Sequence, residues 1–240
     1  MIKNISELLS NNPYPGRGII IGCSEDGQKS IVVYFIMGRS ENSRNRVFEK
    51  TADGIRTAAY DPKKLTDPSL IIYNPVRITN QYVIVTNGDQ TDTILDFINN
   101  DSDFYSALQT REYEPDAPNY TPRISGIINN DGSYDLSILK TLSGNPTGSQ
   151  RNFYKYSKGI PGLGHFISTY ETDGDPLPSF MGEPIPIRIN DSQGLEAFAL
   201  SVWNALDEAN KVSLYAQESN IASGDVNGMI INRHNISEEP

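Results

Sequence analysis

Six arginines in this 240-residue chain stand beside Gly, Pro or Asn residues, close to the ends of apolar runs. They are Arg17, Arg39, Arg44, Arg46, Arg77 and Arg123. A planar guanidinium at a strand end can present two N–H donors to a phosphate monoester. The alternative is that each is a solvated surface arginine paired with one of the abundant carboxylates. A single arginine considered alone does not decide between the two.

Two polar segments add other chemistry. The segment 87–92, Asn-Gly-Asp-Gln-Thr-Asp, closes an apolar run and opens a helical pattern, so its backbone N–H groups could bind an anion or a carbonyl oxygen. An ordinary helix cap would explain it equally well. The segment 112–116, Glu-Tyr-Glu-Pro-Asp, brings three carboxylates together in a turn. A carboxylate near an amide N–H can act as a general base, although an exposed acidic loop is the simpler reading.

Several catalytic signatures are absent from the sequence. It has no phosphate-binding P-loop, no dinucleotide-binding glycine fingerprint and no nucleophile elbow. Its two histidines are predicted to be a structural His165 in a strand and a solvated His234 near the end of the chain. With Cys23 as the single cysteine, neither an internal disulfide nor a cysteine-based zinc site can form, and we expect no metal site.

The elements that must position these residues are mostly strands. β-branched and aromatic runs separated by polar turns predict hairpins, and 18–23 and 31–37 are apolar enough to be buried on both faces. Further strands are expected at 46–50, 55–60, 70–73, 76–79, 82–86, 123–128, 134–139, 153–156, 164–170, 212–216 and 229–231.

Helical periodicity appears in three places. A helix capped by Asp89 begins near Thr91, a short one covers 103–109, and the clearest runs over 192–210 with Ser192 as its cap. Residues 173–186 read as a proline-rich loop, and 236–240 as a frayed end. Many antiparallel strands with few helices predict an α+β fold, and without a linker we expect one domain over residues 1–240.

The charge balance limits the partners. Asp plus Glu is 30 and Lys plus Arg is 20, for a net charge of −10. Binding nucleic acid or anionic lipid requires a basic surface, so neither partner is expected. Residues 1–12 lack the basic and apolar regions of a secretory signal, and the longest apolar run is too short to span a bilayer, which favours a cytoplasmic protein. Strand edges leave room for a homo-oligomer without fixing its size.

Five motifs, in order along the chain, resemble the archaeal-type IMP cyclohydrolase family. They cover residues 14–128 well, whereas the chain beyond resembles the family only loosely. They are Tyr14-Pro-Gly-Arg17; Gly38-Arg-Ser with Asn45-Arg-Val47; Tyr73-Asn-Pro-Val-Arg77; Ile84-Val-Thr-Asn-Gly88 with Thr91-Asp92; and Tyr113-Glu-Pro-Asp116 with Tyr120-Thr-Pro-Arg-Ile124. Pro75 stands where members can carry a cysteine, so no thiol role is transferred.

The resemblance implies cyclisation of 5-formamidoimidazole-4-carboxamide ribonucleotide to IMP with loss of water and without a cofactor. It also implies a four-layer αββα sandwich with mostly antiparallel sheets, like that of the N-terminal nucleophile hydrolases. The chain starts Met-Ile-Lys and Cys23 is internal, which fits use of that fold without covalent catalysis.

The resemblance also suggests residue roles. Arg46 and Tyr73 are assigned to the formyl oxygen and Glu114 to proton transfer. The substrate-binding candidates are Arg17, Arg39, Arg77, Asn87 and Arg123. An amidohydrolase of the same fold acting on another amide, or a non-catalytic protein that binds purine nucleotides, remains an alternative.

Overall fold

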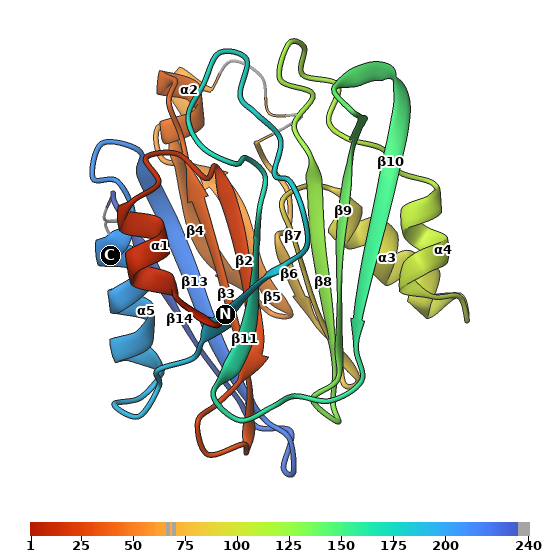
Figure 1. Ribbon diagram of the computed structural model, residues 1–240, viewed down its shortest axis with the longest axis vertical. Coiled ribbons are helices and arrows are strands. Elements are labelled where there is room, and N and C mark those ends of the chain that lie inside the picture. Colours follow the sequence, from red (N-terminus) through yellow and green to blue (C-terminus); the bar gives the residue numbers. More distant parts are fainter. Residues whose placement is uncertain (66–67, 69–70, 235–240) are drawn as a thin grey trace.

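The computed structural model describes residues 1–65, 68 and 71–234, and its main elements are two seven-stranded sheets (Figure 1). In the first sheet all neighbouring strands are antiparallel except β1 and β12. Its strands, in spatial order, are β1 (Lys3–Asn4), β12 (Ile185–Arg188), β11 (Leu163–Ser168), β2 (Arg17–Cys23), β3 (Lys29–Met37), β13 (Lys211–Asn220) and β14 (Val226–Asn232).

The second sheet is antiparallel throughout, and its strands lie side by side in their order along the sequence. In space they run β10 (Asn145–Tyr156), β9 (Tyr134–Leu142), β8 (Arg123–Asn129), β7 (Tyr82–Thr86), β6 (Val76–Ile78), β5 (Gly54–Ala59) and β4 (Arg46–Thr51). Short turns join β4 to β5, β6 to β7, β8 to β9 and β9 to β10, in agreement with the turn residues between the apolar runs, whereas α3 and α4 lie between β7 and β8.

Helices lie on the outer sides of the two sheets (Figure 1). On the first sheet these are α1 (Ile5–Ser10) and α5 (Leu195–Ala205), which share a core with β2 and β3. On the second sheet they are α3 (Gln90–Asn99) and α4 (Phe104–Gln109). The short α2 (Glu41–Arg44) and a 3-10 turn (Pro62–Lys64) belong to connections. The predicted α+β class with mostly antiparallel sheets is confirmed.

The two sheets pack against each other through alternating side chains. Ile19 and Ile21 of β2 join the core between the sheets, whereas Ile20 joins the core beneath α1 and α5. All three have no exposed surface, so β2 is buried on both faces, as its continuous apolar run predicted. The sandwich therefore has one apolar interior between the sheets and another beneath each helix pair.

One predicted strand is wrong. Residues 71–73 form an irregular connection, and Leu70 lies outside the described residues. Thr57 explains the difference, because its hydroxyl donates to the carbonyls of Ile71 and Tyr73 and accepts from the Tyr73 N–H at 2.8 Å. The Thr57 side chain, together with one backbone bond from the Thr57 N–H to the Tyr73 carbonyl at 2.9 Å, takes the place of a strand ladder.

Other predictions needed smaller corrections. The long helix covers Leu195–Ala205, and the residue at its cap is Gly194 with a φ of 93°, not Ser192. Asp89 precedes α3 but makes no side-chain cap bond. Helix α1 had not been predicted, and β12 begins inside the segment expected to be loop. His234 stacks on Tyr60 with ring centroids 4.2 Å apart. The predicted frayed end, 236–240, lies outside the described residues.

Strands of both sheets begin or end at one end of the sandwich, which is the end that carries α2 at the top of Figure 1. Strand β2 begins there with Arg17, β4 begins with Arg46, β8 begins with Arg123, and β7 ends there just before Asn87. Residues from distant parts of the sequence meet at this end. Within the described residues, no helix is both long and apolar enough to cross a membrane.

Candidate active site

Two arginines lie at the centre of this end. Arg46 has no exposed surface; its Nε donates to the Ser43 carbonyl at 2.8 Å and its Nη2 to the Met37 carbonyl at 3.3 Å. Its Nη1, and the Nε of the half-buried Arg17, are buried without a hydrogen-bond partner among the described residues. Burial and the nearby Arg17 cation lower the pKa of Arg46. Buried donors without partners are costly, so this pair is suited to a ligand with acceptor oxygens.

A pair of tyrosine hydroxyls adjoins the arginines. The hydroxyls of Tyr34 on β3 and Tyr73 lie 2.8 Å apart, and either can be the donor. Burial raises the pKa of Tyr34 well above its ordinary value, and the Tyr73 hydroxyl adds to the effect. One bond between two hydroxyls uses one proton, so the second remains available to a ligand.

Glu114 supplies a buried carboxyl group to the same site. Only 2% of its surface is exposed, and its backbone N–H donates to the Thr121 carbonyl at 2.9 Å. Burial raises the pKa of Glu114 to about 7, although the Arg17 and Arg123 cations oppose the increase. A carboxyl group with this pKa can both accept and donate a proton near neutral pH.

The start of α3 positions the groups on the other side of Glu114. Asn87, with no exposed surface, donates from Nδ2 to Glu114 Oε1 at 3.3 Å and accepts the Ile124 N–H at 2.9 Å. Arg123 donates from Nη1 to Asp89 at 2.7 Å and to Gln90 at 2.6 Å.

Gly88 lies between these groups. A Cβ atom there would lie 2.6 Å from both Arg123 Nη1 and Gln90 Oε1, so a larger residue would displace the ends of these two side chains. The segment 87–90, Asn-Gly-Asp-Gln, thus places several polar groups close together beside Glu114 and leads into α3.

Two predicted site residues lie outside this cluster. Arg39 is at the rim, where Nη1 donates to Asp173 at 2.6 Å and to the Gly174 carbonyl at 2.9 Å. Arg77 lies on the helix-bearing face of β6, because its neighbour Val76 faces the opposite sheet. It pairs with Asp53 at 2.7 Å and with Asp92 of α3 at 2.9 Å. Both guanidinium groups already have carboxylate partners.

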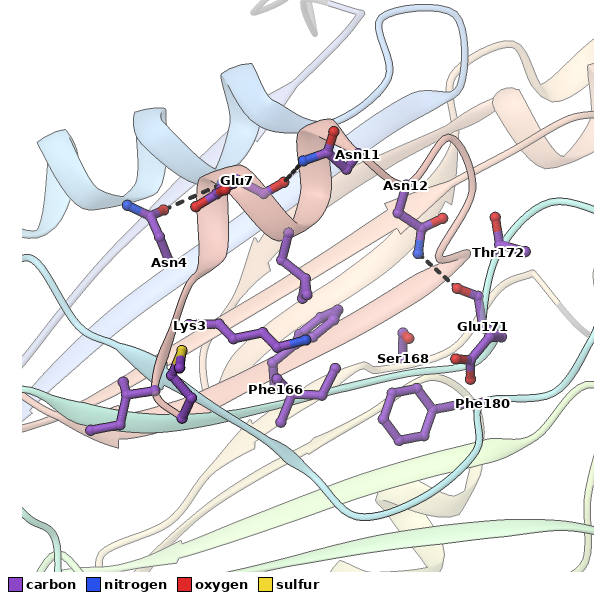
Figure 2. A pocket seen from close by; sticks show the side chains of 14 residues that line it. Lys3, Asn4, Glu7, Asn11, Asn12, Phe166, Ser168, Glu171, Thr172 and Phe180 are labelled. Atoms are coloured by element: carbon purple, nitrogen blue, oxygen red, sulfur yellow. Dashed lines mark hydrogen bonds between the residues drawn. The ribbon is translucent and has the colours of Figure 1, made fainter.

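A separate cavity of about 730 Å³ lies beside α1 (Figure 2). Phe166 and Phe180 line it together with Lys3, Glu7 and Glu171, and none of the predicted site residues reaches it. Across the described part of the chain, no group of three or more His, Cys, Asp or Glu side chains is arranged to hold a metal ion.

Comparison with known families identifies the class of protein. Residues 14–223 match the family described as IMP cyclohydrolase-like protein. The chain belongs to this family. The matched region extends well beyond residue 128, so the second half of the chain also carries family sequence. All eight predicted site residues lie within it.

Curated relatives of this chain carry a name that matches that of the family. A protein named IMP cyclohydrolase from Methanococcus aeolicus is 30% identical over 172 residues, which is 66% of this chain and 74% of that protein. One from Methanosphaera stadtmanae is 32% identical over 162 residues, with the same coverage. A third, from Methanopyrus kandleri, is 29% identical and covers 65% of this chain and 75% of its own.

Sequence reasoning missed several residues of this family member's site. Tyr34 is hidden in an apolar run, where tyrosine reads as core. Tyr170 follows β11, and its hydroxyl lies 2.5 Å from the Thr121 hydroxyl. Gly16, with a φ of 78°, brings the backbone so close to Thr169 that a Cβ would lie 2.3 Å from its hydroxyl. No local motif marks Tyr34 or Tyr170, because their roles depend on contacts across strands. Gly16 lies within the motif Tyr14-Pro-Gly-Arg17, but the motif does not show its close approach to Thr169.

Proposed function

We propose that this protein is an IMP cyclohydrolase, which converts 5-formamidoimidazole-4-carboxamide ribonucleotide to IMP with loss of water. Its membership of the IMP cyclohydrolase-like family and the names of its curated relatives support this function. One observation carries the chemical argument: unpartnered guanidinium N–H groups lie in the same buried site as a carboxyl group with a pKa near 7.

The reaction needs both kinds of group. The carboxamide nitrogen adds to the formyl carbon, a C–N bond forms, and the nitrogen loses a proton while the formyl oxygen becomes a hydroxyl. That hydroxyl then leaves as water together with the proton of the formamide nitrogen, and a C=N bond forms. Negative charge develops on the formyl oxygen in the first step, and the leaving hydroxyl must gain a proton in the second.

The proposed roles follow from these needs. Arg46 and Tyr73 donate hydrogen bonds to the formyl oxygen as it gains charge. Glu114 takes the proton from the attacking nitrogen and returns one to the leaving hydroxyl, for which a pKa near 7 is suited.

We also propose Arg17, Asn87 and Arg123 as substrate-binding residues, because all three adjoin Glu114. Arg39 and Arg77 stay predictions based on the family resemblance alone. A substrate phosphate would have to compete with the carboxylates that these two arginines, like Arg123, already bind.

We further propose that the fold is the four-layer αββα sandwich of the N-terminal nucleophile hydrolases. The two facing sheets and the helix pairs on their outer sides support it. The reaction needs no protein nucleophile, since nucleophile and electrophile belong to the same substrate. Holding them in the reactive rotamer can contribute up to roughly 7–11 kcal/mol.

A turnover assay tests the proposed function. Purified protein mixed with the formamido ribonucleotide should form IMP, detected by chromatography, at the same rate with and without a metal chelator. Wild-type protein that binds IMP tightly but forms none would instead be a nucleotide-binding protein. Hydrolysis of the formamide to the free amine would indicate an amidohydrolase.

A further inference from the structure

A second cavity, of about 600 Å³, is lined by two chain segments that run next to the candidate site, although none of the predicted site residues lines it. Its wall includes Tyr120, and the next residue, Thr121, accepts the N–H of Glu114 on its carbonyl. The opposite wall is the segment 176–181, which folds back on Thr169 and Tyr170 through the Glu171 N–H to Pro178 carbonyl bond of 2.9 Å. The cavity thus shares two chain segments with the site, and its volume is typical of small-molecule pockets.

Lys140 of β9 provides a buried cation in this cavity. Only 6% of its surface is exposed, and its Nζ donates to the Phe180 carbonyl at 2.8 Å and to the Met181 sulfur at 3.4 Å. Among the described residues no carboxylate forms an ion pair with it. Burial lowers the pKa of Lys140, and the nearby Glu171 carboxylate opposes this shift. An ammonium group has three donors, so one remains for a ligand.

The lining of the cavity is unusual for so acidic a protein. It contains no Asp or Glu, although the chain has 30 of them. Its other polar groups are the neutral side chains of Asn119, Tyr120, Thr141, Ser143, Gln150 and Ser179.

Other cavities formed by the described residues differ in charge. The cavity in Figure 2 sets two glutamates against one lysine. The one at the opposite end of the sandwich, beside Asn80 and Asn220, has neither a cation nor a carboxylate in its lining. The Lys140 cavity therefore suits an anion that also needs neutral hydrogen-bond donors.

We propose that Lys140 binds the phosphate of the purine ribonucleotide, with the base directed past Tyr120 towards Glu114. This inference rests on the proposed function for the identity of the ligand. A lysine without a carboxylate partner binds phosphate as a point charge, whereas Arg39 and Arg77 would first have to release their aspartates. Lys140 lies beyond the motifs that carry the family resemblance, so no motif indicated this role.

Binding of IMP and inosine, which differ by the phosphate, tests the proposal. By calorimetry, wild-type protein should bind IMP more tightly than inosine, and Lys140→Met should weaken IMP binding roughly 10- to 100-fold with inosine unaffected. The matched control is Lys155→Met on the outer side of β10, which should keep the wild-type preference. Circular dichroism checks that both variants fold.

Other results would overturn the proposal. They are an unchanged IMP-to-inosine ratio in Lys140→Met, or no preference for IMP in the wild type. If Lys140→Met does not fold, Lys140→Arg is the second variant, because it retains the positive charge. In a separate competition experiment, ribose 5-phosphate should displace IMP from wild-type protein, whereas ribose should not. Failure of that competition also contradicts the proposal. If Lys140→Met loses the phosphate preference while wild-type protein forms no IMP, the phosphate site stands and the proposed activity fails.

Discussion

Buried polar groups occur at both ends of the interior between the sheets, but their hydrogen-bond pairing differs between the two ends. At the end near α2, Arg17 and Arg46 hold N–H groups that have no partner in the described part of the chain, beside the buried Glu114. At the other end, the Tyr134 hydroxyl lies 2.6 Å from His165 Nδ1, and Tyr156 stacks on the His165 ring with centroids 4.0 Å apart. One end leaves donors free, whereas the other pairs its polar atoms with each other.

Electrostatics sharpen the contrast. Burial lowers the pKa of His165 to about 4, so the ring is neutral and can accept the Tyr134 hydroxyl at neutral pH. At the end near α2, the arginine cations and the Glu114 carboxyl group lie close together in one buried space, which lowers the stability of the fold unless a ligand compensates. The candidate site therefore combines buried charges with donors that are unpaired among the described residues, whereas the Tyr134–His165 pair at the other end is neutral and hydrogen-bonded.

The largest expected effect is on proton transfer. Glu114→Gln should lower kcat by about 10²–10⁴, because the amide cannot accept the proton of the attacking nitrogen. Wild-type kcat should rise with pH through about 7 as Glu114 ionises, and the variant should lose this rise. Glu112→Gln, in the same turn but exposed, is the control. Full activity in Glu114→Gln would remove Glu114 from the mechanism.

Loss of an oxyanion donor should have the next largest effect. Arg46→Met or Tyr73→Phe should each reduce kcat by about 10²–10³, since the formyl oxygen loses a donor as its charge develops. Arg56→Met, at an exposed ion pair on β5, serves as the control. Steady-state rates of IMP formation measure both, and a change confined to KM would argue against this role.

The pH dependence of stability should separate the two ends. The folded state holds Glu114 with a pKa above its ordinary value, so its stabilising contribution is complete below about pH 4.5 and is lost as pH rises through about 7. This loss is about 3 kcal/mol, and Glu114→Gln should abolish it.

The pKa of His165 is lowered in the folded state, so its contribution is present above about pH 6.5 and is lost as pH falls through about 4. His165→Phe should therefore flatten only the acid side of the profile. Urea unfolding across this pH range measures both effects. If neither Glu114→Gln nor His165→Phe changes the dependence of the unfolding free energy on pH, the pKa assignments are wrong.

The smallest effect is expected at the paired end. Tyr134→Phe removes one hydrogen bond and should cost about 0.5–1.5 kcal/mol of unfolding free energy. Turnover should be unchanged, because the hydroxyl lies at the opposite end of the sandwich from Glu114. A fall in kcat comparable to that of Tyr73→Phe would break the distinction between the two ends.

The sequence by itself determined the secondary structure wherever local chemistry decides it. Apolar runs separated by turn residues located most strands, and helical spacing located α3, α4 and α5. It failed at residues 71–73, where the Thr57 side chain satisfies the backbone, and at α1, a helix of only six residues. Motif order indicated the family and eight candidate site residues.

Tertiary structure alone decided which of those residues meet. Arg77 and Arg123 look alike in the sequence, yet strand register turns Arg77 towards Asp53 and Asp92, while Arg123 adjoins Glu114. Tyr34 and Lys140 became visible only when strands from opposite sheets and a distant loop enclosed them. Local sequence sets the preferences of each segment, but burial, partner choice and pKa depend on neighbours that only folding brings together.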